Sequence, residues 1–149
     1  MDGGPEQGEA PPELGPVEQA RGIYSRYLDD LNQDPQTRGE IVKAMDTEKS
    51  AEEAAERYAN ASARQGYPIM VVGFLEQTNL PEERRFGILS QAEGEAFRNA
   101  SNTARAYAKK VEANPRDRVA RACKIVAGFE AGRCYQRSED FRQAARELR

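Results

Sequence analysis

The sequence predicts an all-α protein, a compact bundle of about six to seven short-to-medium helices that follows a disordered acidic N-terminal tail. Three observations predict this class. From Val17 onward, apolar residues recur at three- and four-residue spacings. Ser, Asp and Pro residues stand where helices would begin, and only one stretch has the composition of a strand. A length of 149 residues suits one domain, so residues 17–149 are expected to form a single helical domain.

Residues 1–16 are predicted to be a disordered tail. They contain four glycines, four prolines, four acidic side chains and no base, so little apolar surface is available to offset the entropy of ordering. The segment lacks the basic cluster and apolar run of a secretory signal peptide, and no run approaches the roughly 20 apolar residues of a membrane span. With only two cysteines in the chain, a reduced cytoplasmic protein is expected.

The first three helices follow from spacing and capping residues. Asp34 and Pro35 end the first helix and begin a short second one, and Ser50 with Glu53 forms a capping box before an alanine-rich third helix that should end at Gly66. The expected inner residues of the three helices are Val17, Ala20, Tyr24, Tyr27, Leu28 and Leu31; Ile41, Val42 and Met45; and Ala51, Ala54, Ala55, Tyr58 and Ser62.

The segment 67–79, YPIMVVGFLEQTN, is ambiguous. Residues 69–75 have strand composition, whereas Pro68 suits the first turn of a helix and Asn79 suits its end. A single strand would leave an unpaired edge, so a short helix buried on most sides is favoured, with a strand or a contact surface as the alternatives.

The C-terminal half is expected to hold four helices. Pro81 begins a short one, Ser90 with Glu93 forms a second capping box before a longer one, Asn114-Pro115 separates it from the next, Gly132 ends or bends that helix, and Ser138 caps the last. Their expected inner residues are Phe86, Ile88 and Leu89; Phe97, Ala100, Ala104, Tyr107, Ala108 and Val111; Val119, Ala122, Cys123, Val126 and Phe129; and Phe141, Ala144, Ala145 and Leu148.

Two short similarities are present. An aromatic residue precedes Asn-Ala-Ser at residues 58–62 and again at 97–101; with only two copies, helix packing explains the pair better than a repeat array. Residues 132–149 resemble part of a tetratricopeptide repeat, with Gly132, Tyr135, Phe141 and Ala144 at its spacing. The resemblance implies an antiparallel helical hairpin and a protein-binding role, and it covers too little of the chain to assign the family.

The composition contains few of the side chains on which enzyme catalysis usually depends. The chain has no histidine, which excludes Ser-His-Asp and Cys-His catalysis and histidine metal sites. Cys123 and Cys134 are too far apart in sequence for a zinc knuckle; Cys123 is expected in the core and Cys134 in a more exposed position. We therefore expect no catalytic residue, no cofactor and no metal.

Residues 30–41 match a calcium loop only in part. Asp30, Asn32 and Asp34 occupy its first, third and fifth places. The sixth place requires glycine and holds Pro35, and the twelfth requires a bidentate glutamate and holds Ile41. The segment is therefore interpreted as a helix junction.

Charge is distributed unevenly along the chain. Residues 1–97 contain 19 acids and 9 bases, whereas residues 98–149 contain 6 acids and 13 bases. Basic residues at helical spacing on the expected outer faces are candidates for partner binding: Arg98, Arg105, Lys109, Arg121, Lys124, Arg142, Arg146 and Arg149.

The sequence thus favours a non-enzymatic helical protein-binding module, an adaptor, regulator or small assembly subunit that binds a protein partner or itself. The alternative is a nucleic-acid-binding helical protein that uses the arginine- and lysine-rich C-terminal helices. No membrane association is expected.

Overall fold

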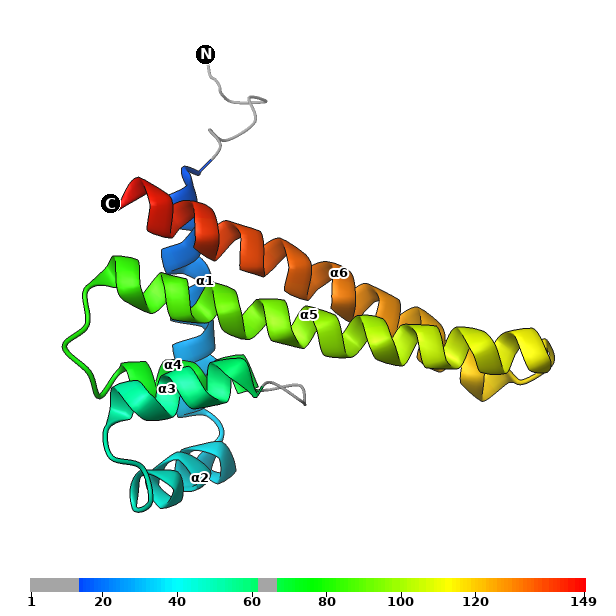
Figure 1. Ribbon diagram of the computed structural model, residues 1–149, viewed down its shortest axis with the longest axis horizontal. Helices are drawn as coiled ribbons and strands as arrows, with labels where there is room; N and C mark the ends of the chain where they lie inside the picture. The colour runs from blue at the N-terminus through cyan, green and yellow to red at the C-terminus, as the bar shows by residue number, and fades with distance from the viewer. Residues whose placement is uncertain (1–13, 62–66) are drawn as a thin grey trace, which may run out of the picture.

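The protein is all-α in its computed structural model, which describes residues 14–61 and 67–149 (Figure 1). Those residues form six helices and no strand, which confirms the predicted class: α1 (Pro16–Asn32), α2 (Pro35–Met45), α3 (Ala51–Asn60), α4 (Tyr67–Leu75), α5 (Glu82–Ala113) and α6 (Arg118–Glu147). Most of the predicted tail, the predicted cap Gly66 and the predicted inner residue Ser62 lie outside the described residues.

The starts of α2 and α3 are the predicted ones. The Asp34 carboxylate accepts a hydrogen bond from the backbone N–H of Thr37 at 3.1 Å, and Pro35 is the first residue of α2. The Ser50 hydroxyl accepts from the backbone N–H of Glu53 at 3.1 Å, which leaves α3 with a capped first turn. Each cap satisfies a backbone donor that has no partner inside its helix.

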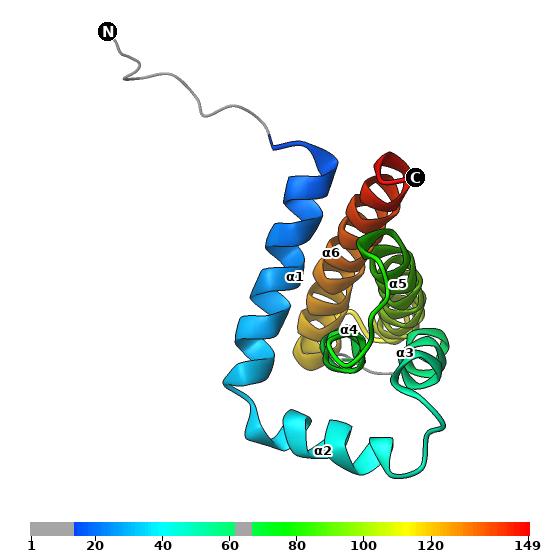
Figure 2. The ribbon, with the colours of Figure 1, turned by 90° about the vertical axis from the view of Figure 1, so that its left-hand side faces the viewer.

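Helix α4 lies in the middle of the bundle, between α1 and α3 with α2 beneath it (Figure 2). The predicted helix is confirmed, and seven of its nine residues are buried. Gly73 is the point of closest approach, because a Cβ atom there would lie 2.3 Å from Cδ1 of Ile41 and 3.2 Å from Cδ2 of Leu31. The absence of a side chain at Gly73 therefore lets α1 and α2 pack against α4.

Helices α5 and α6 form a long antiparallel hairpin, which corrects the predicted breaks at Ser90 and Ser138. Neither serine caps a helix: the Ser90 hydroxyl donates to the carbonyl oxygen of Ser138 at 2.9 Å, and the Ser138 hydroxyl donates to that of Ser90 at 2.8 Å. Gly132 lies inside α6, so residues 132–147 form one continuous helix and not the hairpin that the repeat resemblance implies. The two helices have 32 and 30 residues and are not short-to-medium.

The main core lies at one end of this hairpin, where α1, α3 and α4 pack against it. The Phe86 and Phe141 rings stand 5.6 Å apart there, and the predicted inner residues Phe141, Ala144 and Ala145 are all buried. In α2, Ile41 is buried but Val42 is exposed, contrary to prediction.

The rest of the hairpin projects away from the other helices (Figure 1). We call residues 94–136, which contribute nothing to the main core cluster, the arm. The two aromatic-Asn-Ala-Ser segments have different surroundings: Tyr58 packs on Tyr67 and Phe74 in the bundle, whereas Phe97 packs on Tyr135 in the arm at 5.4 Å.

Candidate functional site

The interior of the arm is built mainly from alanine. Ala100 of α5 and Ala120, Ala127 and Ala131 of α6 are buried there. Because alanine side chains are short, two helices that meet through them approach closely and bury little apolar surface per residue. The contact between the two helices of the arm is therefore made mainly by alanine, the smallest apolar side chain in the arm.

Larger apolar residues of α6, together with Ala122, face outward in the arm. We define the α6 stripe as Val119, Ala122, Val126 and Phe129. These residues were predicted to lie inside the bundle, and the structure corrects that prediction because all four are exposed. Val126 is 67% exposed and Phe129 is 72% exposed. Helix α6 carries two apolar stripes, and at about 100° per residue the alanine stripe and the bulkier stripe point in different directions.

A groove of about 530 Å³ runs along the arm on the side that faces α1 and α4. Tyr27 of α1 and Pro68 of α4 line its inner end, nearest the bundle, and Ala100 and Ala127 line its floor. Val126 belongs both to the groove and to the α6 stripe, so the two surfaces are continuous. The volume falls within the range of ligand sites in proteins, roughly 300–1,000 Å³.

Glu93 lies fully buried among the groove-lining residues. Its Oε2 atom accepts hydrogen bonds from the Tyr27 hydroxyl and from Nε of Arg137, the latter at 3.0 Å. Arg137 also reaches Oε1 of Glu130 through Nη2 at 3.5 Å. The Oε1 atom of Glu93 is buried and has no hydrogen-bond partner among the described residues. A buried carboxylate with one oxygen unsatisfied is uncommon in folded proteins.

Burial dominates the electrostatics of this cluster. Burial raises the pKa of Glu93, and the nearby Arg137 guanidinium and Tyr27 hydroxyl oppose that shift by favouring the charged form. Burial and the adjacent negative charge of Glu93 together raise the pKa of the Tyr27 hydroxyl, so this group remains a proton donor to the carboxylate near neutral pH.

The two cysteines have exchanged their predicted environments. Cys134 is buried beside the cluster, where its thiol lies 3.5 Å from Oε1 of Glu130, and Cys123 is partly exposed. Burial, followed by the charge of Glu93, raises the pKa of Cys134 to about 12. No group of His, Cys, Asp or Glu in residues 14–61 and 67–149 is arranged to hold a metal ion.

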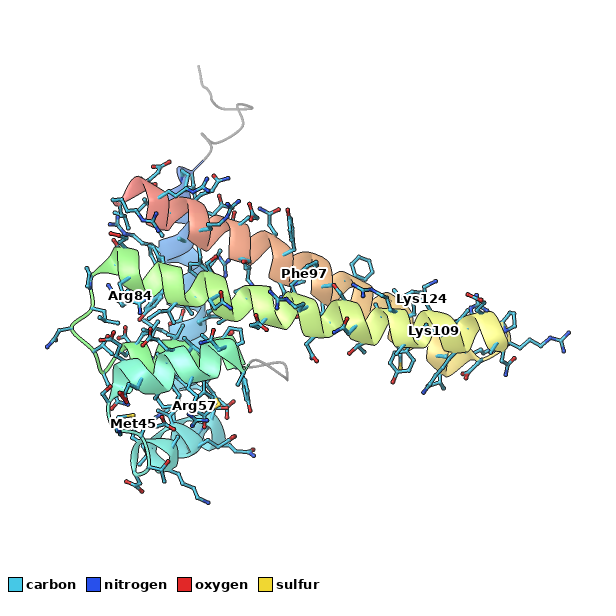
Figure 3. The ribbon with its side chains drawn as sticks, in the orientation of Figure 1. Met45, Arg57, Arg84, Phe97, Lys109 and Lys124 are labelled. Atoms are coloured by element: carbon cyan, nitrogen blue, oxygen red, sulfur yellow. The ribbon has the colours of Figure 1, made fainter. Side chains whose placement is uncertain are left out.

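The eight basic residues predicted for partner binding are exposed and fall into two groups. Arg98, Arg105, Lys109, Arg121 and Lys124 lie on the arm, where Figure 3 labels Lys109 and Lys124. Arg142, Arg146 and Arg149 lie near the C-terminus; Arg142 pairs with Glu139, and Arg149 lies 3.6 Å from Glu83. Arg121 and Arg142 are 21 residues apart on one helix, about 32 Å. None of the eight lines the groove.

Sequence reasoning missed the buried role of Glu93 by assigning it to a capping box with Ser90. The available signal was its position: Phe86, Leu89, Glu93 and Ala100 recur at helical spacing on one face of α5. A single carboxylate on an otherwise apolar face indicates either a surface position or a buried polar contact, and periodicity alone does not choose between them.

Comparison with known proteins returns no relative. No protein-family model, curated protein or solved structure matches this chain. Within the described ranges, no helix combines the length and the apolar character that crossing a bilayer requires.

Proposed function

We propose that this chain is a helical protein-binding module that binds a partner through the α6 stripe and the adjoining groove. The observation that carries the proposal is the exposure of Val126 and Phe129 on a projecting arm whose own packing uses alanine. Large apolar side chains grouped on a surface are typical of protein contacts. Burying each of the two would contribute about 1.5–3 kcal/mol of hydrophobic free energy to binding.

A non-enzymatic role as adaptor, regulator or small assembly subunit, acting in the cytoplasm, is part of this proposal. It is supported by the composition, because a chain without histidine lacks the usual general base near neutral pH. The exposed basic residues of the arm, Arg105, Lys109, Arg121 and Lys124, favour nucleic acid as the second candidate partner.

Site-specific photo-crosslinking in cells tests the two candidates. A benzophenone amino acid at position 129 samples the α6 stripe, and the same group at position 109 samples the basic side of the arm. We expect one protein to crosslink at position 129, to remain after nuclease treatment and to disappear when Val126→Asp is added. The matched control is Gly128→Asp, which adds the same carboxylate at an exposed position of α6 outside the stripe and should leave that crosslink in place.

Two results would contradict the proposal. Crosslinks at position 129 that persist in the Val126→Asp chain would show that the stripe does not hold the partner. Crosslinks confined to position 109, lost after nuclease treatment and weakened between low and moderate salt, would favour the nucleic-acid alternative.

A further inference from the structure

The shape of the groove and stripe fits a helix. The members of the α6 stripe recur at intervals of three, four and three residues, which is the spacing at which one helix presents side chains to another. Ala100 and Ala127 on the groove floor leave room for a third helix to lie close to the α5–α6 seam. From Val119 to Arg137 the surface extends for about 27 Å, the length of an 18-residue helix.

The inner end of the groove has a distinct charge requirement. The residues that line the groove include three acids, Asp30, Glu93 and Glu130, and two bases, Arg133 and Arg137. Arg133 lies 3.7 Å from Glu130, and Arg137 contacts both Glu130 and Glu93, so both bases are already engaged by carboxylates. The lining residues as a whole therefore carry one acid more than bases, and Oε1 of Glu93, whose Oε2 is bonded to Arg137, is the buried acceptor without a partner.

We propose that the groove binds an amphipathic helix of a partner protein, and that Glu93 selects a helix that carries a lysine or arginine within its apolar face. This inference rests on the proposed function and adds the chemistry of the partner. A long basic side chain places its charge at the inner end of the groove while its methylene groups lie along the apolar walls. A cation supplies the donor that Oε1 lacks and balances the one excess acidic charge among the lining residues, and hydrogen bonds between charged groups are stronger than neutral ones.

Selection from a library of displayed helices tests the inference without knowledge of the natural partner. The library consists of helices of about 18 residues with a randomised apolar face, and the target is the full chain. Binders are sorted against the Val126→Asp chain to retain those that need the α6 stripe. We expect the retained helices to share a lysine or arginine at one fixed position of the apolar face.

Matched substitutions then measure the contribution of the basic residue. Replacing it by norleucine should weaken binding to the native chain by at least about tenfold. The same replacement should have little effect with Glu93→Gln, which keeps the size of the side chain and removes its charge. Glu95→Gln removes a carboxylate two residues away that does not line the groove, and it should preserve the preference. Circular dichroism before and after heating verifies that each variant is folded.

The failures of the inference and of the proposed function are distinguishable. Stripe-dependent binders without the fixed basic residue, or binders indifferent to norleucine, overturn the role of Glu93 and leave the proposed function standing. A library that returns no stripe-dependent binder overturns both. A third outcome is that the native chain is a dimer in solution and that Val126→Asp converts it to a monomer. The groove would then be occupied by a second copy of this chain, and the assignment of a separate partner would be overturned.

Discussion

The Arg137 guanidinium donates through Nε to Oε2 of Glu93 at 3.0 Å, which joins α6 to α5 where the arm leaves the bundle. Tyr27 donates to the same oxygen and adds α1 to this junction. Glu93 has no exposed surface and the Arg137 side chain is only 18% exposed, so this ion pair is held largely away from water. A buried pair of this kind contributes little net stability when intact and is costly to break on one side.

We therefore expect the loss of Arg137 alone to be more damaging than the loss of both charges. Arg137→Leu leaves Glu93 buried without its cation and should lower the free energy of unfolding by about 3–5 kcal/mol. Adding Glu93→Gln to Arg137→Leu should recover most of that loss, because the remaining amide is neutral. Urea unfolding followed by circular dichroism measures both values. Equal losses in the single and the double variant would indicate that packing, and not the uncompensated charge, controls the effect.

Stability should depend on pH through Glu93. Its folded pKa is raised above the ordinary value of 4.5, so the folded protein holds this proton more tightly than the unfolded chain does. The resulting stabilisation is full below pH 4.5 and is lost as the pH rises through the folded pKa. The Tyr27 hydroxyl, Arg137 and Glu130 are the groups that set this value, and burial exceeds the opposing effect of the first two.

The free energy of unfolding of the native chain, minus that of Glu93→Gln, should accordingly fall as the pH is raised above 4.5. Urea titrations at several pH values measure this difference. Glu95→Gln provides the baseline for removing a carboxylate from the same helix. A difference that grows with pH would mean that the Arg137 ion pair outweighs burial at Glu93.

Gly73 should not accept a side chain. The Cβ atom of Gly73→Ala would meet Cδ1 of Ile41 at 2.3 Å, and overpacking of this kind costs about 1–3 kcal/mol. Ile41→Val removes that Cδ1 atom, so the double variant should be more stable than Gly73→Ala alone. Gly87 is the control, because a Cβ there meets nothing within 4 Å; Gly87→Ala should stabilise α5 by about 0.5–1 kcal/mol. Thermal unfolding of the four variants measures these effects.

Substitutions in the α6 stripe should leave the free chain folded. Val126→Asp and Phe129→Asp change exposed positions and should alter the free energy of unfolding by no more than about 0.5 kcal/mol. Ala127→Asp, one residue from Val126, places a charge in the alanine interior of the arm and should separate the two helices. Hydrogen exchange of the arm amides reports the difference. Strong destabilisation by Val126→Asp would mean that the bulkier stripe faces α5, as the sequence alone suggests.

The two thiols should react at different rates. Cys134 is buried and its pKa is raised to about 12, so its thiolate is scarce near neutral pH. Cys123 is partly exposed and should be alkylated first. Mass spectrometry of the native chain after brief treatment with N-ethylmaleimide measures the order. Preferential labelling of Cys134 would show that the junction around Glu93 opens readily in solution.

Local chemistry predicted much of the fold because its signals act within a few residues. The helix starts at Asp34 and Ser50 depend on a side chain and a backbone N–H three positions later, and both are present as predicted. The helical state of residues 67–75, whose composition is that of a strand, was favoured because Pro68 suits a first helical turn and a single strand would leave an unpaired edge. The burial of Phe141 follows from helical spacing. The basic residues were also predicted to face outward, and this prediction requires only the period of a helix.

By itself, then, the sequence determined that the chain is helical, where α2 and α3 begin and which residues of the last turns of α6 face inward. Only the tertiary structure decided the continuity of α5 and α6, since Ser90 and Ser138 bond to each other's carbonyls instead of capping. It also decided which apolar side of α6 meets α5 and that Glu93 is buried. The physical reason is that a helix period specifies faces, whereas the choice among faces depends on how closely a neighbouring helix can approach.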